Sequence, residues 1–267
     1  VREKQTRNGY EVAGKWWTVN PLTDEVIGDG KKNHRPQNFS ILWDSLRAGL
    51  HGSGLQLQDS KTTFRTFNNC AGMRADIVLP YENFDIIVGE PTALKIAISN
   101  SHDQSSKLNI AAMIYRYWCT NGQASMSENT SLSQLNTISS DPERIGAVAA
   151  KWPEFLKEDA HKMKQMQGVP VSRYDAINFY SEHVASTQTR SGKVVNRTML
   201  DRIMGIHDTY KSLGDTSYRV YNTLTHLSTH VESKACPTKK QLLLEEKIGG
   251  IVLGDAFQEL ALPYSYA

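Results

Sequence analysis

The chain has 267 residues, of which 39% are hydrophobic and 22% charged, a composition typical of a globular protein that buries a sizeable core. Its formal net charge of +2 excludes the overall positive charge of a histone-like protein, so any site for a polyanion must be local. The sequence contains neither an apolar run of the roughly 18 residues that a membrane helix needs nor the apolar segment of a signal peptide, and we expect a cytoplasmic protein without membrane contact.

Short extended segments are predicted through the first half of the chain. Residues 10–28 favour a β-hairpin, because the strand-forming Trp16, Trp17 and Val19 precede turn residues. Residues 38–50 favour a helix, since their apolar side chains recur at helical spacing. Further segments rich in β-branched or aromatic residues predict strands at 62–69, 73–80, 84–89, 93–101 and 107–114.

Helices are predicted through the second half. The Ser/Thr-rich segment 127–140 is typical of a connector, and Asp141 then supplies a helix cap before Pro142. Apolar spacing predicts helices at 142–151, 153–167, 172–186, 197–213, 217–232 and 238–261. Residues 186–197, "STQTRSGKVVNR", predict a flexible basic loop, and they lie in the region 183–247, where ten basic residues stand against six acidic ones.

This order of elements predicts an α+β fold, in which an antiparallel, hairpin-rich sheet from the N-terminal half packs against helices that come mostly from the C-terminal half. We expect a single domain over residues 1–267. Within it, residues 1–126 are mainly sheet with one helix, 127–140 form the connector and 141–267 are mainly helical. The sequence shows no internal repeat.

One polar stretch invites a catalytic interpretation. His102 and Asp103 lie among serines 99, 101, 105 and 106, as the parts of a hydrolase site would. The chain has no GxSxG motif, however, and neighbouring residues of a strand point to opposite faces of the sheet. A polar turn held by Asp103 and the serines, Ser105 in particular, is the favoured interpretation, with Asn121-Gly122 reversing the chain further on.

Metal and cofactor sites are not predicted. His226 and His230 share a helix face at i, i+4 spacing, but Leu227 stands where an HExxH motif has its glutamate, and a third ligand is needed. His207-Asp208 could complete such a site from another helix. The glycine-rich stretches lack the spacing of a nucleotide-binding loop. The three cysteines, at 70, 119 and 236, have no paired spacing and are expected to be buried free thiols.

A nucleic-acid site requires cations for the phosphates and exposed aromatic rings for the bases, and the sheet half supplies this mixture. Alternation along "FRTF" places Phe64 and Thr66 on one face and Arg65 and Phe67 on the other. No RNP-like motif is present. The predicted contact residues are Lys61, Phe64, Arg65, Phe67, Arg74, Lys95, Lys107, Tyr115, Arg116 and Tyr117.

The stretch "SNSHDQSSKLNIAAMIYRYWCTNG" resembles a pattern found in a family of phage and plasmid proteins of unassigned function. The family pattern is Ser-His-Asp-x-Ser, a hydrophobic segment, then Arg-x-x-Cys-x-Asn-Gly. The segment "YRVYNTLTHLSTHVES" is similar to the C-terminal helical part of that family, and the resemblance spans residues 40–260. Gln104 departs from it, because the family often has Gly there. The matching positions are Ser101, His102, Asp103, Ser105, Arg116, Cys119, Asn121 and Gly122.

A sheet followed by helices is also similar to the order of elements in phage single-strand annealing proteins, which form rings or filaments on single-stranded DNA. This resemblance implies a cytoplasmic, homo-oligomeric protein that binds single-stranded DNA through its sheet half and serves annealing or recombination, without a cofactor. Two alternatives remain open. One is a phage hydrolase or nuclease that uses His102 and Asp103, with a metal at His226 and His230. The other is a structural or host-interaction protein that acts through its helical half.

Overall fold

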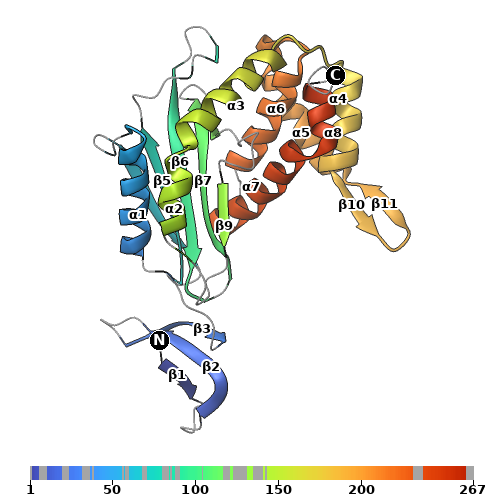
Figure 1. Cartoon of the computed structure of the whole chain (residues 1–267). Coiled ribbons are helices and arrows are strands. Elements are labelled where there is room, and N and C mark those ends of the chain that lie inside the picture. Colours follow the sequence, from blue (N-terminus) through green and yellow to red (C-terminus); the bar gives the residue numbers. More distant parts are fainter. Residues whose placement is uncertain are drawn as a thin grey trace. The chain divides into compact units, whose positions relative to one another are not determined.

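A computed structural model of the chain is shown in Figure 1. The structure describes residues 2–5, 11–19, 24–31, 37, 39–55, 57, 60–67, 71–79, 84, 86–87, 91–103, 105–116, 121–122, 131–134, 141, 143–230 and 237–262. The chain divides into two compact units that alternate along the sequence. Unit 1 comprises residues 1–80, 95–112 and 129–154, and unit 2 comprises residues 81–94, 113–128 and 155–267.

The first sheet of unit 1 is a three-stranded antiparallel ribbon in the order β1-β2-β3. Its strands are β1 (Arg2–Gln5), β2 (Glu11–Val19) and β3 (Val26–Lys31). Strands β2 and β3 pair from Lys15 opposite Lys31 to Val19 opposite Val26, which confirms the predicted hairpin. Most of the turn between them lies outside the described residues.

The main sheet has the strand order β4-β5-β6-β7-β8, and β9 pairs with β7. Its antiparallel strands lie within two residues of those predicted, apart from 84–89, where the described Phe84, Ile86 and Ile87 are outside any strand. Strand β9 falls in the segment predicted to be only a connector. The bounds are β4 (Lys61–Phe67), β5 (Gly72–Leu79), β6 (Thr92–Ser101), β7 (Leu108–Arg116), β8 (Asn121–Gly122) and β9 (Ser131–Gln134).

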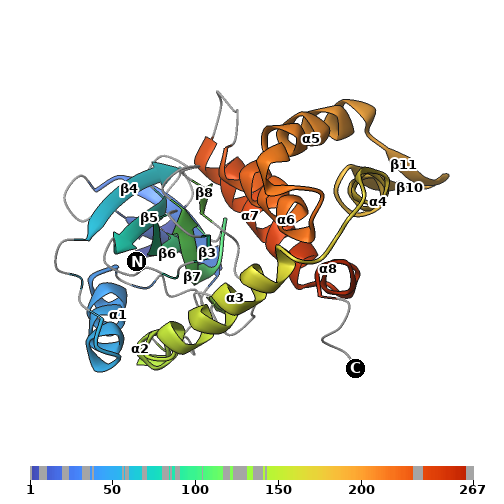
Figure 2. The same cartoon turned by 90° about the horizontal axis from the view of Figure 1, so that it is seen from above.

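Two helices of unit 1, α1 (Phe39–Gly52) and α2 (Glu143–Ala149), lie on one side of this sheet (Figures 1 and 2). Successive side chains of a strand point to opposite faces of the sheet, so every second side chain of each strand points toward a core. The helices pack closely, since a Cβ on Gly49 of α1 would lie 2.2 Å from the carbonyl oxygen of Gly146 in α2. Buried apolar residues of these elements include Leu42, Leu46, Leu50, Ala75, Ile77, Leu79, Ile96, Ile98, Leu108, Ile110, Ala112 and Ile145.

Unit 2 is mostly helical, and α6 is its most buried helix, with all residues from Ser217 to Thr225 buried. The predicted helices are confirmed with three differences. The helix predicted at 197–213 ends as an α-helix at Thr209 and is followed by a short 3-10 helix. The segment predicted as one helix at 172–186 changes at Tyr180 from α-helix to π-helix, and that predicted at 238–261 is interrupted at Gly254. The bounds are α3 (Trp152–Met166), α4 (Arg173–Phe179), the π-helix η2 (Tyr180–Val184), α5 (Arg197–Thr209), the 3-10 helix η3 (Lys211–Leu213), α6 (Ser217–Thr229), α7 (Pro237–Leu253) and α8 (Asp255–Ala261).

The basic segment predicted as a flexible loop is an ordered β-hairpin. Strands β10 (Ser186–Thr189) and β11 (Gly192–Val195) pair antiparallel over four positions. The next residue, Asn196, caps α5 by accepting a hydrogen bond from the backbone N–H of Met199 at 3.0 Å. Over the described part of the chain, every helix falls short of the length and apolar character that crossing a membrane demands.

Candidate functional site

Strand β4 is the terminal strand of the main sheet as far as the sheet is described. Its register with β5 sets Lys61 opposite Val78, Arg65 opposite Arg74 and Phe64 opposite Ala75. Because residues directly opposite share a face, Lys61 and Arg65 point to one side and Phe64 to the other. Lys61 is exposed and the ring of Phe64 is 55% exposed. The edge of the sheet therefore carries two cations and one accessible aromatic ring within five consecutive residues.

Behind Lys61 and Arg65 on the same face lies an ionic cluster around Asp76. Arg74 donates from Nε and Nη2 to the Asp76 carboxylate at 2.9–3.1 Å, and the Lys95 ammonium lies 3.1 Å from Oδ1. Arg65 donates to Oδ2 of the same carboxylate. Arg74 is 1% exposed and Lys95 and Asp76 are each 7% exposed, so the centre of the cluster is buried.

The charges of the cluster fix the ionisation of Asp76. Burial alone raises the pKa of a carboxyl group, because it disfavours the charged form. Here the hydrogen bonds from Arg74 and Arg65 and the charges of Lys95 and Arg74 outweigh burial and hold the pKa of Asp76 well below its usual value. The ionised Asp76 in turn fixes the guanidinium of Arg65, whose side chain is 37% exposed. Arg65 is thus the outward-facing member of the cluster.

The predicted contact residues fall into distinct environments. Lys61 and Lys107 are exposed, Phe64 and Arg65 are accessible on β4, and Tyr115 is half-buried on β7. Phe67, Arg74 and Lys95 are buried and offer almost no surface to a large ligand. Arg116 ends β7, but its side chain and all of Tyr117 lie outside the described residues. Of the predicted set, β4 carries Lys61, Phe64 and Arg65, and Arg65 is linked to Arg74 and Lys95 through Asp76.

The His102-Asp103 pair forms part of a turn after β6. An Oδ1 atom of Asp103 accepts a hydrogen bond from the backbone N–H of Ser105 at 3.0 Å. The Ser101 hydroxyl accepts from the N–H of Ser106 and donates to its carbonyl oxygen, at 2.9 and 2.8 Å. The Asp103 side chain holds the turn, as predicted. The second side chain that holds the turn is that of Ser101, and Ser105 takes part through its backbone N–H.

The chain reversal predicted at Asn121-Gly122 is replaced by a short strand, since these residues form β8 and pair with Tyr115 and Arg116. The connecting residues 117–120 and two of the pattern positions, Gln104 and Cys119, lie outside the described residues, as do Cys70 and Cys236. The prediction of buried thiols therefore stays a prediction.

His226 and His230 face each other at the end of α6, with ring centroids 4.4 Å apart. The hydroxyl of Tyr210 lies 2.9 Å from Nδ1 of His226. Burial, together with the charges of His230 and Arg202, lowers the pKa of His226. Within the described ranges, no three His, Cys, Asp or Glu side chains come together as metal ligands.

His207 and Asp208, proposed to complete a metal site, have other partners. Nδ1 of the buried His207 lies 3.0 Å from the hydroxyl of Tyr180 and 3.3 Å from that of Thr223. Asp208 pairs with Arg173 and lies 3.5 Å from Arg219. Burial, followed by the charge of Arg219, lowers the pKa of His207 to about 4, so this imidazole is neutral at pH 7. His207, Tyr180 and Thr223 form a buried polar network, whereas the Arg173–Asp208 pair beside it is exposed. Sequence reasoning missed this network, because its members come from separate helices.

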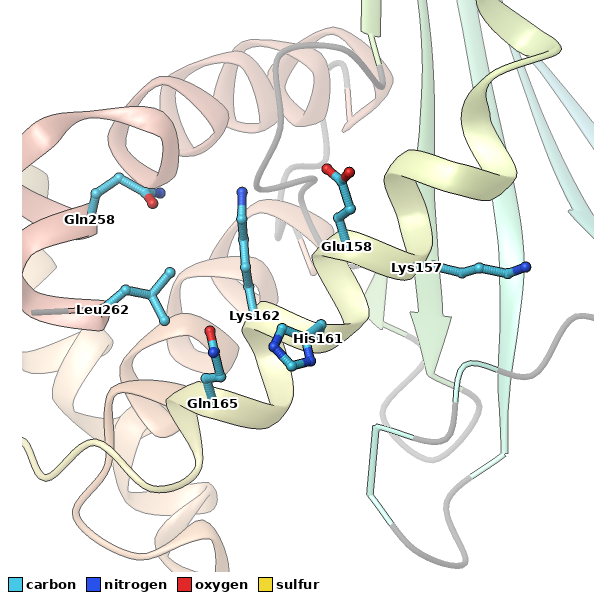
Figure 3. Close-up of a pocket in the computed structure, with 7 residues that line it drawn as sticks. All are labelled: Lys157, Glu158, His161, Lys162, Gln165, Gln258 and Leu262. Carbon is cyan, nitrogen blue, oxygen red and sulfur yellow. The ribbon is translucent and has the colours of Figure 1, made fainter. Parts of the chain in front are cut away.

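A shallow groove of about 670 Å³ runs between α3 and α8 in unit 2. Figure 3 shows Gln258 and Leu262 opposite α3, whereas Lys157 points away from them. Its α3 side is lined largely by exposed polar side chains of both charges, and Leu262 supplies a buried apolar contact. Such flexible side chains at an open surface do not preorganise a reaction centre. The α3 residues are Lys157, Glu158, His161, Lys162 and Gln165.

These features define an α+β protein whose sheet carries an accessible cationic and aromatic edge. The chain belongs to the family described as a domain of unknown function, DUF932, whose sequence profile matches residues 82–247. Neither the curated proteins nor the solved structures include a match to the chain. The family segment contains Lys95, Lys107, the His207-Asp208 pair and the His226-His230 pair, whereas β4 and β5 precede it.

Proposed function

We propose that the protein binds single-stranded DNA along β4 and the adjoining polar face of the main sheet, and that it serves annealing or recombination as a homo-oligomer in the bacterial cytoplasm. The observation that carries the proposal is the position of Phe64, more than half exposed on a terminal strand between Lys61 and Arg65. Aromatic rings stack on bases of any sequence, and nearby cations neutralise phosphates.

The dimensions of β4 suit a short stretch of polynucleotide. A strand rises about 3.3 Å per residue, so Lys61 and Arg65 are separated by about 13 Å along the chain. A polynucleotide that follows the edge over this distance would meet the two cations on one face and the ring of Phe64 on the opposite face of β4. Base stacking on an aromatic side chain contributes about 1–3 kcal/mol per base. Lys107, exposed just before β7, provides a further cation in unit 1.

The Asp76 cluster supports this role by holding Arg65 in one orientation. A side chain fixed before binding loses less conformational entropy when it contacts a ligand. Arg74 and Lys95 contribute positive potential from beneath the surface, although their burial prevents direct contact. The proposal thus keeps Lys61, Phe64, Arg65 and Lys107 as contact residues and assigns a supporting role to the buried cations.

The phage or plasmid origin and the link to annealing rest on the resemblance of the Ser-His-Asp-x-Ser and Arg-x-x-Cys-x-Asn-Gly pattern and on the order of sheet and helices. Fold order by itself does not fix function. The turn geometry of Ser101 and Asp103 favours a binding protein over a hydrolase, because these polar side chains hold backbone groups in place.

The test measures anisotropy of a fluorescent single-stranded oligonucleotide over a range of salt concentrations. Wild-type affinity is expected to fall with salt, and the triple variant Lys61→Ala, Phe64→Ala, Arg65→Ala is expected to bind at least tenfold more weakly. Its log–log salt slope should be smaller by about 1.4, from about 0.7 for each lost phosphate contact. The matched control is Arg47→Ala with Lys151→Ala, two exposed cations of unit 1 outside the main sheet.

Absence of wild-type binding at low salt would overturn the proposal, as would equal binding by the triple variant and the control. Electron micrographs of the protein with and without the oligonucleotide test the assembly. Rings or filaments that respond to the strand are expected, and a monomer under both conditions would contradict the oligomeric part of the proposal.

A further inference from the structure

The β10–β11 hairpin projects from the helices of unit 2 in both views (Figures 1 and 2). Apart from Ser186 and Gly192, which are half-buried, all its strand residues are exposed, as are the turn residues Arg190 and Ser191. The Thr189 hydroxyl donates to the carbonyl oxygen of Gly192 at 2.6 Å and closes the turn. An isolated two-stranded hairpin is marginally stable in water, so this one depends on its base for order.

The base of the hairpin is fixed on both sides. The backbone N–H of Asn196 donates to the carbonyl oxygen of Ala185 at 2.7 Å, directly below the first strand pair. The Ser186 hydroxyl donates to the carbonyl oxygen of Glu182 in η2, and Lys247 of α7 donates to that of Val184. Asn196 is also the cap of α5. The hairpin is therefore presented as an arm whose direction is set by three helical elements.

The arm carries positive charge alone. The sequence contains no Asp or Glu between Glu182 and Asp201, and Arg190, Lys193 and Arg197 are all exposed. In a chain with a net charge of only +2, this local excess selects a polyanion as its partner. Val194 and Val195 are 52% and 40% exposed, so the same arm also offers apolar contact area.

The shape of the arm favours duplex nucleic acid. Paired strands lie about 4.8 Å apart, and with their side chains they fill a width close to the roughly 12 Å of the major groove of B-DNA, which accepts a two-stranded ribbon. The register places Gln188 beside Lys193 on one face and Thr187 beside Val194 on the other. Amide and hydroxyl groups can bond base edges, and a Val methyl can contact the methyl of thymine.

We infer that the β10–β11 arm binds duplex DNA in its major groove, with Arg190 and Lys193 of the arm, and Arg197 at the start of α5, against the phosphates. This inference rests on the proposed function in one respect, because the duplex is taken to be the product that single-strand annealing would form. The arm then gives the protein a second contact, separate from β4, that is made only once two strands have paired.

The test is duplex binding by the variant Arg190→Glu with Lys193→Glu, measured by anisotropy across salt concentrations. Affinity for duplex is expected to fall at least tenfold. The slope of log affinity against log salt concentration should be smaller by about 1.8, because each of the two lost phosphate contacts contributes about 0.9. Affinity for single-stranded oligonucleotide should change less than twofold. The control is Lys164→Glu with Lys211→Glu, an equal charge change at exposed positions of unit 2. Arg190→Gln with Lys193→Gln repeats the test without introducing negative charge, and melting curves verify folding.

Equal duplex binding by the arm variants and the control would overturn the inference and leave the β4 proposal standing. Loss of duplex binding in the arm variants, combined with wild-type single-strand binding by the β4 variant, would support the arm and contradict the β4 proposal. A wild-type protein that binds neither form would overturn both.

Discussion

The ring of Phe67 lies against the backbone of Gly72, its partner across β4 and β5. A Cβ added at Gly72 would lie 2.1 Å from a ring carbon, so the two residues fit only because Gly72 has no side chain. Phe67 shares a face with Arg65, as the alternation of "FRTF" predicts, yet its ring covers the neighbouring strand and is only 6% exposed. This contact explains why Phe67 is buried, whereas Phe64 on the opposite face of β4 is 55% exposed.

Substitution of Gly72 by Ala should destabilise the protein. The added methyl group must displace the Phe67 ring from its buried position, and such overpacking costs about 1–3 kcal/mol. The expected result in urea denaturation is a lower midpoint with an unchanged slope. Gly52→Ala is the control, because nothing lies within 4 Å of a Cβ at that position. A midpoint for Gly72→Ala equal to that of the control would contradict the packing described.

Replacing Asp76 by Asn should be more damaging, because it leaves Arg74 and Lys95 buried without their carboxylate. Breaking a buried ion pair from one side costs about 3–5 kcal/mol. The effect should depend on pH. Since the folded-state pKa of Asp76 is depressed, its stabilising contribution is complete above the ordinary value of 3.8 and is lost as the pH falls below it.

The free energy of unfolding of Asp76→Asn should therefore lie below that of wild type by a constant amount from pH 7 to about pH 5. This difference should shrink below pH 4. Chemical denaturation at several pH values measures it. The exposed Asp44, changed to Asn, serves as the comparison and should behave as wild type. A constant deficit down to the lowest accessible pH would argue against ionisation of Asp76 as its source.

Unit 2 should lose stability between pH 6.5 and pH 4. The folded-state pKa of His207 is about 4 against an ordinary 6.5, so the buried ring stabilises the fold fully above pH 6.5 and progressively less as the pH falls to 4. A pKa difference of one unit corresponds to about 1.4 kcal/mol, so the free energy of unfolding should fall by about 3 kcal/mol in all over this pH range. His207→Gln should remove this pH dependence, and His161→Gln on the exposed side of α3 should retain it. Identical pH profiles for the two variants would refute the assignment.

Chelation should leave DNA binding unchanged. The His226-His230 pair lies close enough to Arg202 for that positive charge to lower the pKa of His226, an environment unfavourable to a bound cation. We expect the same oligonucleotide affinity with and without EDTA, and the same again for His226→Ala with His230→Ala. Metal analysis of the purified protein and a nuclease digestion assay complete the measurement. About one equivalent of metal together with EDTA-sensitive cleavage would instead establish the nuclease alternative.

Local sequence patterns predict much of this fold, because alternation and helical spacing act over a few residues. The strands β4 to β7 and the helices α1 to α3 all follow from such patterns. The segment 84–89 has strand-forming residues, but the described Phe84 instead donates from its N–H to the hydroxyl of Thr92. The Ser/Thr-rich connector yields β9, since pairing with β7 overrides its polar composition.

The candidate site is predicted less completely, because exposure is a tertiary property. Arg74 and Asp76 stand two residues apart in an otherwise apolar strand, which signals a shared face and an ion pair. Lys95 joins them from β6, and no local pattern indicates that contact. Likewise, the loop composition of 186–197 conceals a hairpin. The Ser186 hydroxyl donates to the carbonyl oxygen of Glu182 in η2, and Lys247 of α7 donates to that of Val184 at the end of η2.

The π-helix before the arm fixes where the arm points. In η2 the N–H of Ala185 donates to the carbonyl oxygen of Tyr180, five residues earlier, so this turn holds one residue more than an α-helical turn. Each residue of an α-helix turns the chain by about 100°. Removal of a single residue from η2 would therefore rotate the β10–β11 arm by roughly that angle about the helix axis. Related chains with a turn of the same length should therefore direct the β10–β11 arm as this protein does, and chains with a shorter or longer turn should direct it differently.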